Sequence, residues 1–385
     1  MKRIYLFIIL IMAGLFIVNC GRTGQFTSSG MLPGSVIYTV DTTGDTGYFS
    51  SMAFDNNGNP WIAYYDATDG VLKLAHYNGG GFVTEVVDKN GDTGLYPSLA
   101  IDGNNVPHIT YYDATDSVLK YAYKTQQGWV IRTIDPFNPN GTYSSLKLDV
   151  SGNPHFTYIT AAPLNYELKY GFISSSNGLN LQFVDTGASL QQGYGTGDIN
   201  FTSSLQLTPQ GIPYVSYYNA SNGTLKLGSY DTSTQQWNLQ IVANGSELQP
   251  SSKDVGMYNS LVLDSANNPH ISYYDADNGT LRYAYNDGTG WNYEYIDAES
   301  FVGAYNSIAI DQFGNPVVAY QDVTNDALKF AIRGNKGWST YYVDRSDIYR
   351  TGYWISMAKS PAGGLGISYR NATSHALMFA YINYY

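Results

Sequence analysis

The sequence predicts an all-β protein, a seven-bladed β-propeller of four-stranded antiparallel blades, and three observations support this prediction. One segment recurs seven times with a serine at a fixed place, at Ser51, Ser98, Ser145, Ser204, Ser260, Ser307 and Ser356. The spacings between these serines are 47, 47, 59, 56, 47 and 49 residues, which is the size of a propeller blade or a solenoid unit. The chain also holds 37 Tyr and 40 Gly, typical of strands joined by tight turns, and no helical period follows the N-terminus. Finally, the two chain ends together supply one blade.

Each repeat is expected to form one sheet. In the first copy, four strands are predicted at residues 51–55, 61–66, 71–77 and 82–88. The connections are rich in turn formers: residues 56–60 end in Pro60, residues 67–70 end in Gly70, and residues 79–81 are all Gly. Four short strands joined in this way make an antiparallel blade of about 45 residues.

The chain ends are expected to close the ring. The seventh copy supplies only three strands before Tyr385, and residues 36–41 match the fourth strand of the other copies. An N-terminal strand that completes the last blade removes an exposed sheet edge. The propeller is therefore predicted over residues 36–385.

Most repeated polar residues are interpreted as parts of the scaffold. An Asp recurs at the first turn, where its side chain can accept bonds from the turn backbone, at Asp55, Asp102, Asp149, Asp264 and Asp311. Acidic pairs in the second turn precede a Lys or Arg, which favours cross-strand charge pairs, although calcium held by some of these turns is an alternative. The histidines His108, His155 and His270 share a position that Trp61 and Val317 fill elsewhere, so no zinc site is predicted.

The first twenty residues resemble the signal of an exported bacterial lipoprotein. Lys2 and Arg3 precede an apolar run over residues 4–18, which suits a signal peptide better than a membrane span. Cys20, the only cysteine, follows directly after Asn19. The resemblance implies a signal peptide over residues 1–19 and lipidation at Cys20, which would anchor the protein in the bacterial outer membrane or at the cell surface. An ordinary secretory signal with an incidental cysteine is the alternative.

The remaining composition limits the partners. The small, polar residues 20–35 are expected to form a flexible tether. The formal net charge is −11, which excludes nucleic acid as a partner because phosphates need Lys and Arg. With one cysteine, no disulfide is expected to support the fold, and no cofactor is predicted beyond the calcium alternative. The only membrane contact expected is through the lipid.

The repeats resemble those of exported bacterial propellers of the Tyr-Tyr-Asp-Ala-Thr-Asn-Gly type and, more loosely, sialidase-like propellers. The fifth copy carries the resemblance clearly, with Tyr273, Tyr274, Asp275 and Ala276 after the turn. The resemblance implies the fold. The Asp boxes of sialidases, with the pattern Ser-x-Asp-x-Gly-x-x-Trp, are absent from the sequence.

Candidate binding residues are those that break the repeat or form an aromatic series. Long crossings follow the third and fourth copies, and Tyr369 is followed by Arg370 where the repeat has a second Tyr; long loops on a rigid scaffold often carry function. In six of the seven copies an aromatic residue stands two places before the repeated serine, and Thr202 takes this place in the other copy. These aromatic residues are interpreted either as packing between blades or as an exposed rim for ligands. The candidates are Tyr194, Asp198, Glu247, Asp254, Arg370, Tyr96, Tyr143, Tyr258, Tyr305 and Trp354.

Two functions of different class follow from these candidates. The first is a cell-envelope-anchored, non-catalytic binding lipoprotein that recognises a glycan or a protein through the loop face of the propeller. The alternative is a glycan-active hydrolase or lyase that uses carboxylates of the long crossings. No Ser-His-Asp signature, phosphate loop or metal motif is found in the sequence, so binding is preferred and no catalytic residue is assigned.

Overall fold

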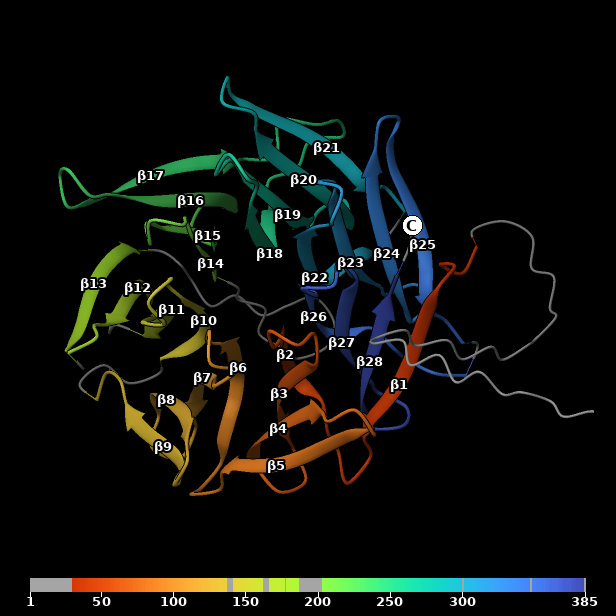
Figure 1. The fold of residues 1–385 in the computed structure, drawn as a ribbon. Coiled ribbons are helices and arrows are strands. Elements are labelled where there is room, and N and C mark those ends of the chain that lie inside the picture. Colours follow the sequence, from red (N-terminus) through yellow and green to blue (C-terminus); the bar gives the residue numbers. More distant parts are fainter. Residues whose placement is uncertain are drawn as a thin grey trace, which may run out of the picture.

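The structure, a computed structural model, is a seven-bladed β-propeller, as predicted (Figure 1). It describes residues 30–136, 141–161, 166–176, 178–186, 203–299, 301–346 and 348–383. Within these residues there are seven four-stranded antiparallel sheets and no helix. The sheets surround a common centre, with the first strand of each repeat innermost (Figure 1).

Each blade uses four consecutive strands except the last. The first three blades contain β2 (Tyr48–Phe54), β3 (Pro60–Asp66), β4 (Val71–Tyr77), β5 (Phe82–Asp88), β6 (Thr93–Ile101), β7 (Pro107–Asp113), β8 (Val118–Thr125), β9 (Gly128–Thr133), β10 (Thr142–Leu148), β11 (Pro154–Ala161), β12 (Tyr166–Ile173) and β13 (Leu179–Thr186). The next three contain β14 (Ser203–Leu207), β15 (Pro213–Asn219), β16 (Thr224–Asp231), β17 (Gln236–Ala243), β18 (Val255–Leu263), β19 (Pro269–Asp275), β20 (Thr280–Asn286), β21 (Trp291–Asp297), β22 (Val302–Ile310), β23 (Pro316–Asp322), β24 (Ala327–Gly334) and β25 (Gly337–Asp344). The seventh contains β26 (Tyr353–Lys359), β27 (Leu365–Asn371), β28 (Ala376–Ile382) and β1 (Ser35–Asp41).

The N-terminal strand closes the ring, which confirms the prediction from the chain ends. β1 pairs antiparallel with β28, from Ser35 opposite Ile382 to Asp41 opposite Leu377. In Figure 1 the red strand β1 lies beside the blue strand β28. The last blade is thereby complete and its outer edge is occupied.

The repeated serine joins each blade to the next. Its hydroxyl oxygen accepts the backbone N–H of the residue that follows the next blade's serine, at 2.9 to 3.2 Å. The series runs around the whole ring and ends where Met52 donates to Ser356. A hydrogen bond typically contributes about 1 kcal/mol, so the seven bonds together favour closure of the ring.

The innermost strands begin earlier than predicted. β2 starts at Tyr48 instead of Ser51 because Tyr48 still pairs with Tyr65 beyond an irregularity at residues 49–50. Such a bulge adds a residue on one strand and interrupts the alternation of side chains. The other three strands of this blade start and end within one residue of their predicted positions.

The first-turn aspartates cap their turns, as predicted. Asp55 Oδ1 accepts the N–H groups of Asn57 and Asn59 at 2.9 and 2.8 Å. The same pattern recurs at Asp102, Asp149, Asp264 and Asp311. These carboxylates are therefore satisfied by backbone donors.

Residues of the expected tether lie on the propeller, and its last residue, Ser35, begins β1. Leu32 is buried in the core between the sixth and seventh blades, and its N–H donates to the carbonyl of Tyr342 at 2.8 Å. Met31 forms a bridge with the same tyrosine. No helix of the described residues is both long and apolar enough to cross a membrane, and residues 1–29, with Cys20, lie outside them.

Candidate ligand-binding face

The crossings between blades and the turns between the second and third strands lie on one face of the ring, called the loop face below. In five blades, the first residue of this turn donates its N–H to a carbonyl of the neighbouring crossing, as Ala67 does to Asp45 and Ala276 to Asp254. The preceding blade adds side-chain contacts, since the Tyr65 and Tyr218 hydroxyls donate to Asp92 and Asp254 at 2.8 and 2.6 Å. The crossings are therefore held in place by the blades on both sides.

The aromatic series forms a collar where the innermost strands begin. We call Phe49, Tyr96, Tyr143, Tyr258, Tyr305 and Trp354 the aromatic collar. All six have positive φ angles, between 48° and 55°. Each sits at the bulge of its innermost strand.

The collar residues contact one another across the blade boundaries. Centroid separations run from 4.1 Å for Tyr96 and Tyr143 to 5.8 Å for Tyr305 and Trp354, and Phe49 joins the two halves. Five of the six are only partly buried. The rings pack between blades and keep an accessible part, and binding of a ligand by this rim stays a prediction. A left-handed backbone costs a non-glycine residue about 1–2 kcal/mol, and such strain is concentrated at functional sites.

Arg370 is enclosed at the edge of this collar. Its guanidinium lies 4.2 Å from the Tyr48 ring and 5.5 Å from the Trp354 ring, and it pairs with Asp45. The side chain is 5% exposed. It occupies the place of Tyr65 and Tyr218 in other blades and makes the equivalent contact with the neighbouring crossing. The departure from the repeat therefore preserves a contact between blades.

The two described carboxylates of the long β17–β18 crossing have local partners. Glu247 accepts the N–H groups of Asn244 and Gly245, both at 2.8 Å. Asp254 accepts the Tyr218 hydroxyl, and burial together with the nearby Asp277 raises the pKa of its carboxyl group. The other two candidates on crossings, Tyr194 and Asp198, lie outside the described residues, as does Thr202.

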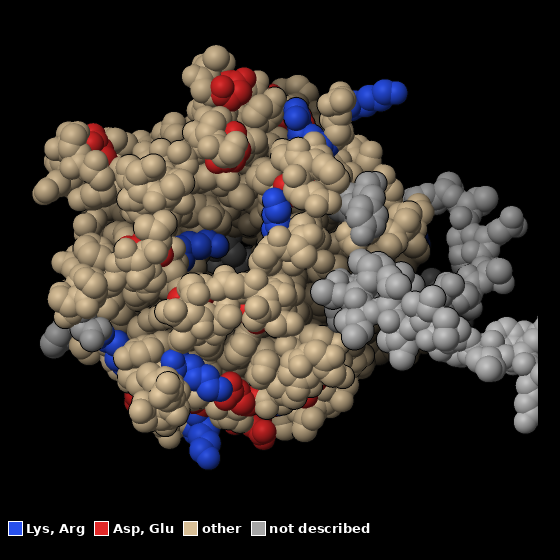
Figure 2. All heavy atoms as spheres, in the orientation of Figure 1, with Lys and Arg blue, Asp and Glu red and all other residues tan. Residues whose placement is uncertain are grey.

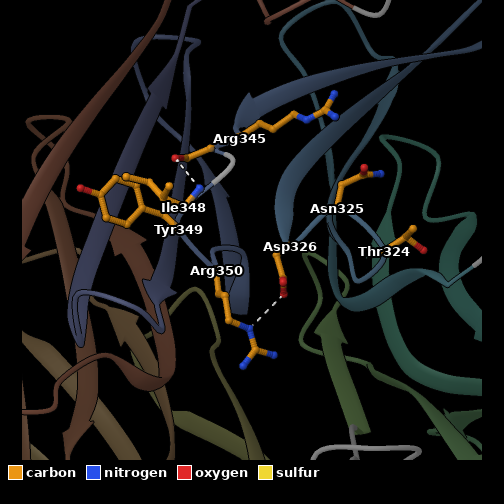
Figure 3. Close-up of a pocket in the computed structure, with 8 residues that line it drawn as sticks. Thr324, Asn325, Asp326, Arg345, Ile348, Tyr349 and Arg350 are labelled. Atoms are coloured by element: carbon orange, nitrogen blue, oxygen red, sulfur yellow. Dashed lines mark hydrogen bonds and ion pairs between the residues drawn. The ribbon is translucent and has the colours of Figure 1, made fainter.

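A pocket of about 240 Å³ lies on the loop face between the sixth and seventh blades (Figure 3). The β23–β24 turn contributes Asn325 and Asp326, and the β25–β26 crossing contributes Arg345, Tyr349 and Arg350. Figure 3 shows the two arginines on different sides of this space, with Arg350 bonded to Asp326 at 3.2 Å.

The pocket combines apolar and polar groups. Ile348 and Tyr349 are 72% and 43% exposed, so apolar surface is available beside amide, carboxylate and guanidinium groups. This mixture suits a saccharide, which presents hydroxyls at its edge and C–H groups on its face. Sequence reasoning did not select these residues. The sequence does contain a signal for this pocket, because the crossing is two residues longer than the crossings of regular repeats and carries two arginines.

Charged side chains are scattered on the face of the propeller shown in Figure 2. Lys, Arg, Asp and Glu lie among uncharged residues, and the surface is hollowed at the centre of the ring. No broad area of Lys and Arg is visible among the described residues on that face.

The acidic second turns are arranged as charge pairs. Asp66 is fully buried and its carboxylate lies 3.3 Å from Lys73, while Asp113 pairs with Lys120 and Asp275 with Arg282. Asp66 also accepts the N–H of Thr68 at 3.0 Å. Over the described part of the chain, no group of three or more His, Cys, Asp or Glu side chains is arranged to hold a metal ion.

The three aligned histidines lie on the opposite face, each between a tyrosine and the turn aspartate. His108 Nδ1 is 2.5 Å from the Tyr121 hydroxyl, and its Nε2 is 3.7 Å from Asp102. His155 and His270 repeat the arrangement with Asp149 and Asp264. Burial lowers the pKa of all three imidazoles below the usual 6.5.

These histidines are expected to make the propeller sensitive to mild acid. Because each folded-state pKa lies below that of the unfolded chain, their contribution is complete above about pH 6.5 and is lost as pH falls from there toward the folded-state values. Melting temperatures measured between pH 7 and pH 5 should therefore decrease. The double variant His270→Val/Tyr283→Phe copies the sixth blade, where Val317 and Phe330 occupy these places, and should reduce the decrease. An unchanged pH profile would contradict this origin.

Comparisons with known proteins agree with the architecture. No protein-family model matches the sequence, and a search of curated proteins finds no match. Among solved structures, the polysaccharide lyase Uly1 is 11% identical, with a TM-score of 0.57 and 94% of each chain covered. The GH93 α-L-arabinofuranosidase of Fusarium graminearum is 11% identical, with a TM-score of 0.50 and 75% of this chain and 92% of that chain covered. The Dos1 propeller is 9% identical, with a TM-score of 0.51 and 90% and 94% covered. At these identities the similarities show one thing, the β-propeller fold.

Proposed function

We propose that this protein is a lipid-anchored protein of the bacterial cell envelope that binds a glycan on its loop face without cleaving it. The observation that carries the proposal is the pocket between the sixth and seventh blades, where the exposed Tyr349 and Ile348 adjoin Asn325 and two arginines. Two of the propellers of similar fold, a polysaccharide lyase and an α-L-arabinofuranosidase, are named for action on saccharides, which supports a glycan as ligand. The N-terminal segment with Cys20 supports the anchor.

Two described carboxylates of the loop face support binding over cleavage. Asp326 is paired with Arg350, and Glu247 caps backbone N–H groups of its own loop. Glycoside hydrolysis needs two carboxyl groups about 5–9.5 Å apart across the scissile bond. One observation favours the second candidate, a hydrolase or lyase: the carboxyl group of Asp254 has a raised pKa, as a general acid requires.

A glycan array probed with the chain from residue 30 onward tests the proposal, because Met31 and Leu32 belong to the folded part. Binding without new reducing ends or unsaturated products is the expected result. Release of such products, abolished by Asp254→Asn, would replace the binding function by the enzymatic one. Absence of binding to any glycan, with binding to an envelope protein instead, would overturn the choice of ligand.

Tyr349→Ala is expected to weaken binding of the glycan found on the array by about tenfold. Loss of an aromatic stacking contact and its buried area accounts for about 1.4 kcal/mol. Phe313→Ala is the matched control, because Phe313 is a 60% exposed aromatic residue in a first turn on the opposite face. Isothermal titration of both variants measures the difference. Equal affinities would place the ligand elsewhere on the loop face.

A further inference from the structure

A buried or partly buried carboxylate joins the blades at six of the seven boundaries. It lies in the outer strand of one blade or within two residues of the end of that strand. It accepts a hydrogen bond from the first tyrosine of the second strand in the next blade. The pairs are Asp41–Tyr64, Asp88–Tyr111, Asp135–Tyr158, Asp185–Tyr217, Asp297–Tyr320 and Asp344–Tyr369, at 2.6 to 2.8 Å. A lysine of the third strand contacts the same carboxylate at five of these boundaries.

The boundary between the fourth and fifth blades lacks this carboxylate. Ala243 lies opposite Leu225, the position that Asp88 holds opposite Leu72. The tyrosine is kept as Tyr273, and the lysine is replaced by Arg282, which pairs with Tyr273 across β19 and β20. Both side chains are completely buried.

Three polar atoms of Tyr273 and Arg282 have no acceptor among the described residues. Arg282 Nη2 bonds with Asp275, the carbonyl of Pro250 at 3.0 Å and the Tyr295 hydroxyl at 3.3 Å. Its Nε and Nη1 have no partner in the described structure, and neither does the Tyr273 hydroxyl. A buried polar group left without a partner costs about 1–3 kcal/mol, so three such donors at one place require an explanation.

The charges at this boundary also differ from those of the regular repeats. Lys73 contacts two aspartates, Asp41 and Asp66. Lys120 likewise contacts Asp88 and Asp113. Arg282 has Asp275 as its one carboxylate partner among the described residues. Four of the five lysines have two or more carboxylate partners, and Lys226 has one. Arg282 lacks the aspartate of the outer strand, and Glu247, the other carboxylate near Tyr273, is bonded to backbone N–H groups of its own loop.

We infer that a small monovalent anion, of the chemical class of chloride or formate, occupies the place of the missing aspartate and accepts hydrogen bonds from Tyr273 and Arg282. An anion can accept the Tyr273 hydroxyl together with one of the two unpartnered N–H groups of Arg282, and its charge replaces that of the missing aspartate. A water molecule supplies no charge and would need acceptors for its own protons. This anion site is independent of the proposed glycan function. Because it lies under the β17–β18 crossing, the bound anion would stabilise the conformation of that crossing.

The same crossing encloses the site. The carbonyls of Gln249 and Pro250 accept the Tyr295 hydroxyl at 3.0 Å and the Arg282 guanidinium. Exchange of the anion must therefore displace residues of this loop, and we expect it to be slow compared with binding on an open surface.

Crystals soaked or grown in bromide test the inference directly. The expected result is an anomalous peak within hydrogen-bond distance of Arg282 Nε or Nη1 and of the Tyr273 hydroxyl. Crystals grown in formate without halide should show a planar molecule at the same place, which separates the two ligands of this class. A peak-free site that holds water in both crystals would overturn the inference.

Unfolding in solution provides a second measurement. At constant ionic strength, chloride or bromide should stabilise the full chain relative to gluconate, which is too large for the site. At a hundredfold excess over the dissociation constant, the unfolding equilibrium constant should fall about a hundredfold. Equal stability in chloride and gluconate would contradict anion binding.

The variant Ala243→Asp supplies the carboxylate from the chain and is expected to abolish the dependence on halide. The double variant Ala243→Asp/Arg282→Lys restores the residues of the regular repeat. It replaces the single variant in this test if the single variant does not fold. Persistence of the halide effect in the folded variant would show that the anion binds elsewhere. Phe313→Ala, far from this boundary, should keep the full halide effect.

Discussion

Asp297→Ala is expected to lower the free energy of unfolding by about 3–5 kcal/mol. The Asp297 carboxylate accepts the Tyr320 hydroxyl at 2.7 Å and lies 2.6 Å from Lys329 Nζ. Both of these partners are almost completely buried. Without the carboxylate, the tyrosine hydroxyl loses its acceptor, and Glu299, which is mostly exposed, is the one carboxylate partner that Lys329 keeps among the described residues. Urea unfolding followed by tyrosine and tryptophan fluorescence measures the change.

Two variants separate the possible causes. Asp297→Asn keeps an acceptor for Tyr320 but removes the charge, so an intermediate loss is expected. Asp69→Ala removes an exposed carboxylate of a second turn and should change stability by less than about 0.5 kcal/mol. If Asp297→Ala unfolds at the same urea concentration as Asp69→Ala, the carboxylates between blades do not stabilise the ring.

The fold could be predicted because its determinants are local and repeated. The first-turn Asp, the second-turn Gly and the alternation of Tyr and small residues each act within a few positions of the chain. Seven copies of the same signals left little ambiguity, and residues 36–41 matched the fourth strand of the other copies closely enough to predict closure of the ring.

The partners of the candidate site residues could not be predicted in the same way, because they belong to other blades. Arg370 was selected as a departure from the repeat, yet its partner Asp45 lies 325 residues away and the contact replaces a tyrosine–aspartate bond of the regular repeat. A single sequence shows the substitution but not its partner. The pocket likewise joins the β23–β24 turn to the β25–β26 crossing, and only the fold brings Asp326 next to Arg350.

The aromatic collar was located by sequence, but its geometry was not. The repeat shows that an aromatic residue precedes the serine by two positions in six copies, and it cannot show that the backbone there has positive φ. Left-handed conformation is expected for Gly, Asn or Asp, so six bulky residues in that region are a consequence of the bulge and of packing around the ring. Tyr305 and Trp354 thereby lie beside each other instead of in separate blade interfaces.

Gly94→Ala is expected to destabilise the propeller by about 2–6 kcal/mol, a cost comparable with that of Asp297→Ala. Gly94, the second residue of the innermost strand β6, has φ +100°, a conformation that side chains rarely adopt, and strain of this kind costs about 1–3 kcal/mol. A Cβ atom there would also lie 2.5 Å from Leu72 Cα in the preceding blade, and such overpacking costs about 1–3 kcal/mol more. Gly103→Ala is the matched control, because nothing lies within 4 Å of an added Cβ and its φ is not positive. If urea unfolding gives the two variants equal midpoints, the close contact between neighbouring blades at Gly94 does not stabilise the ring.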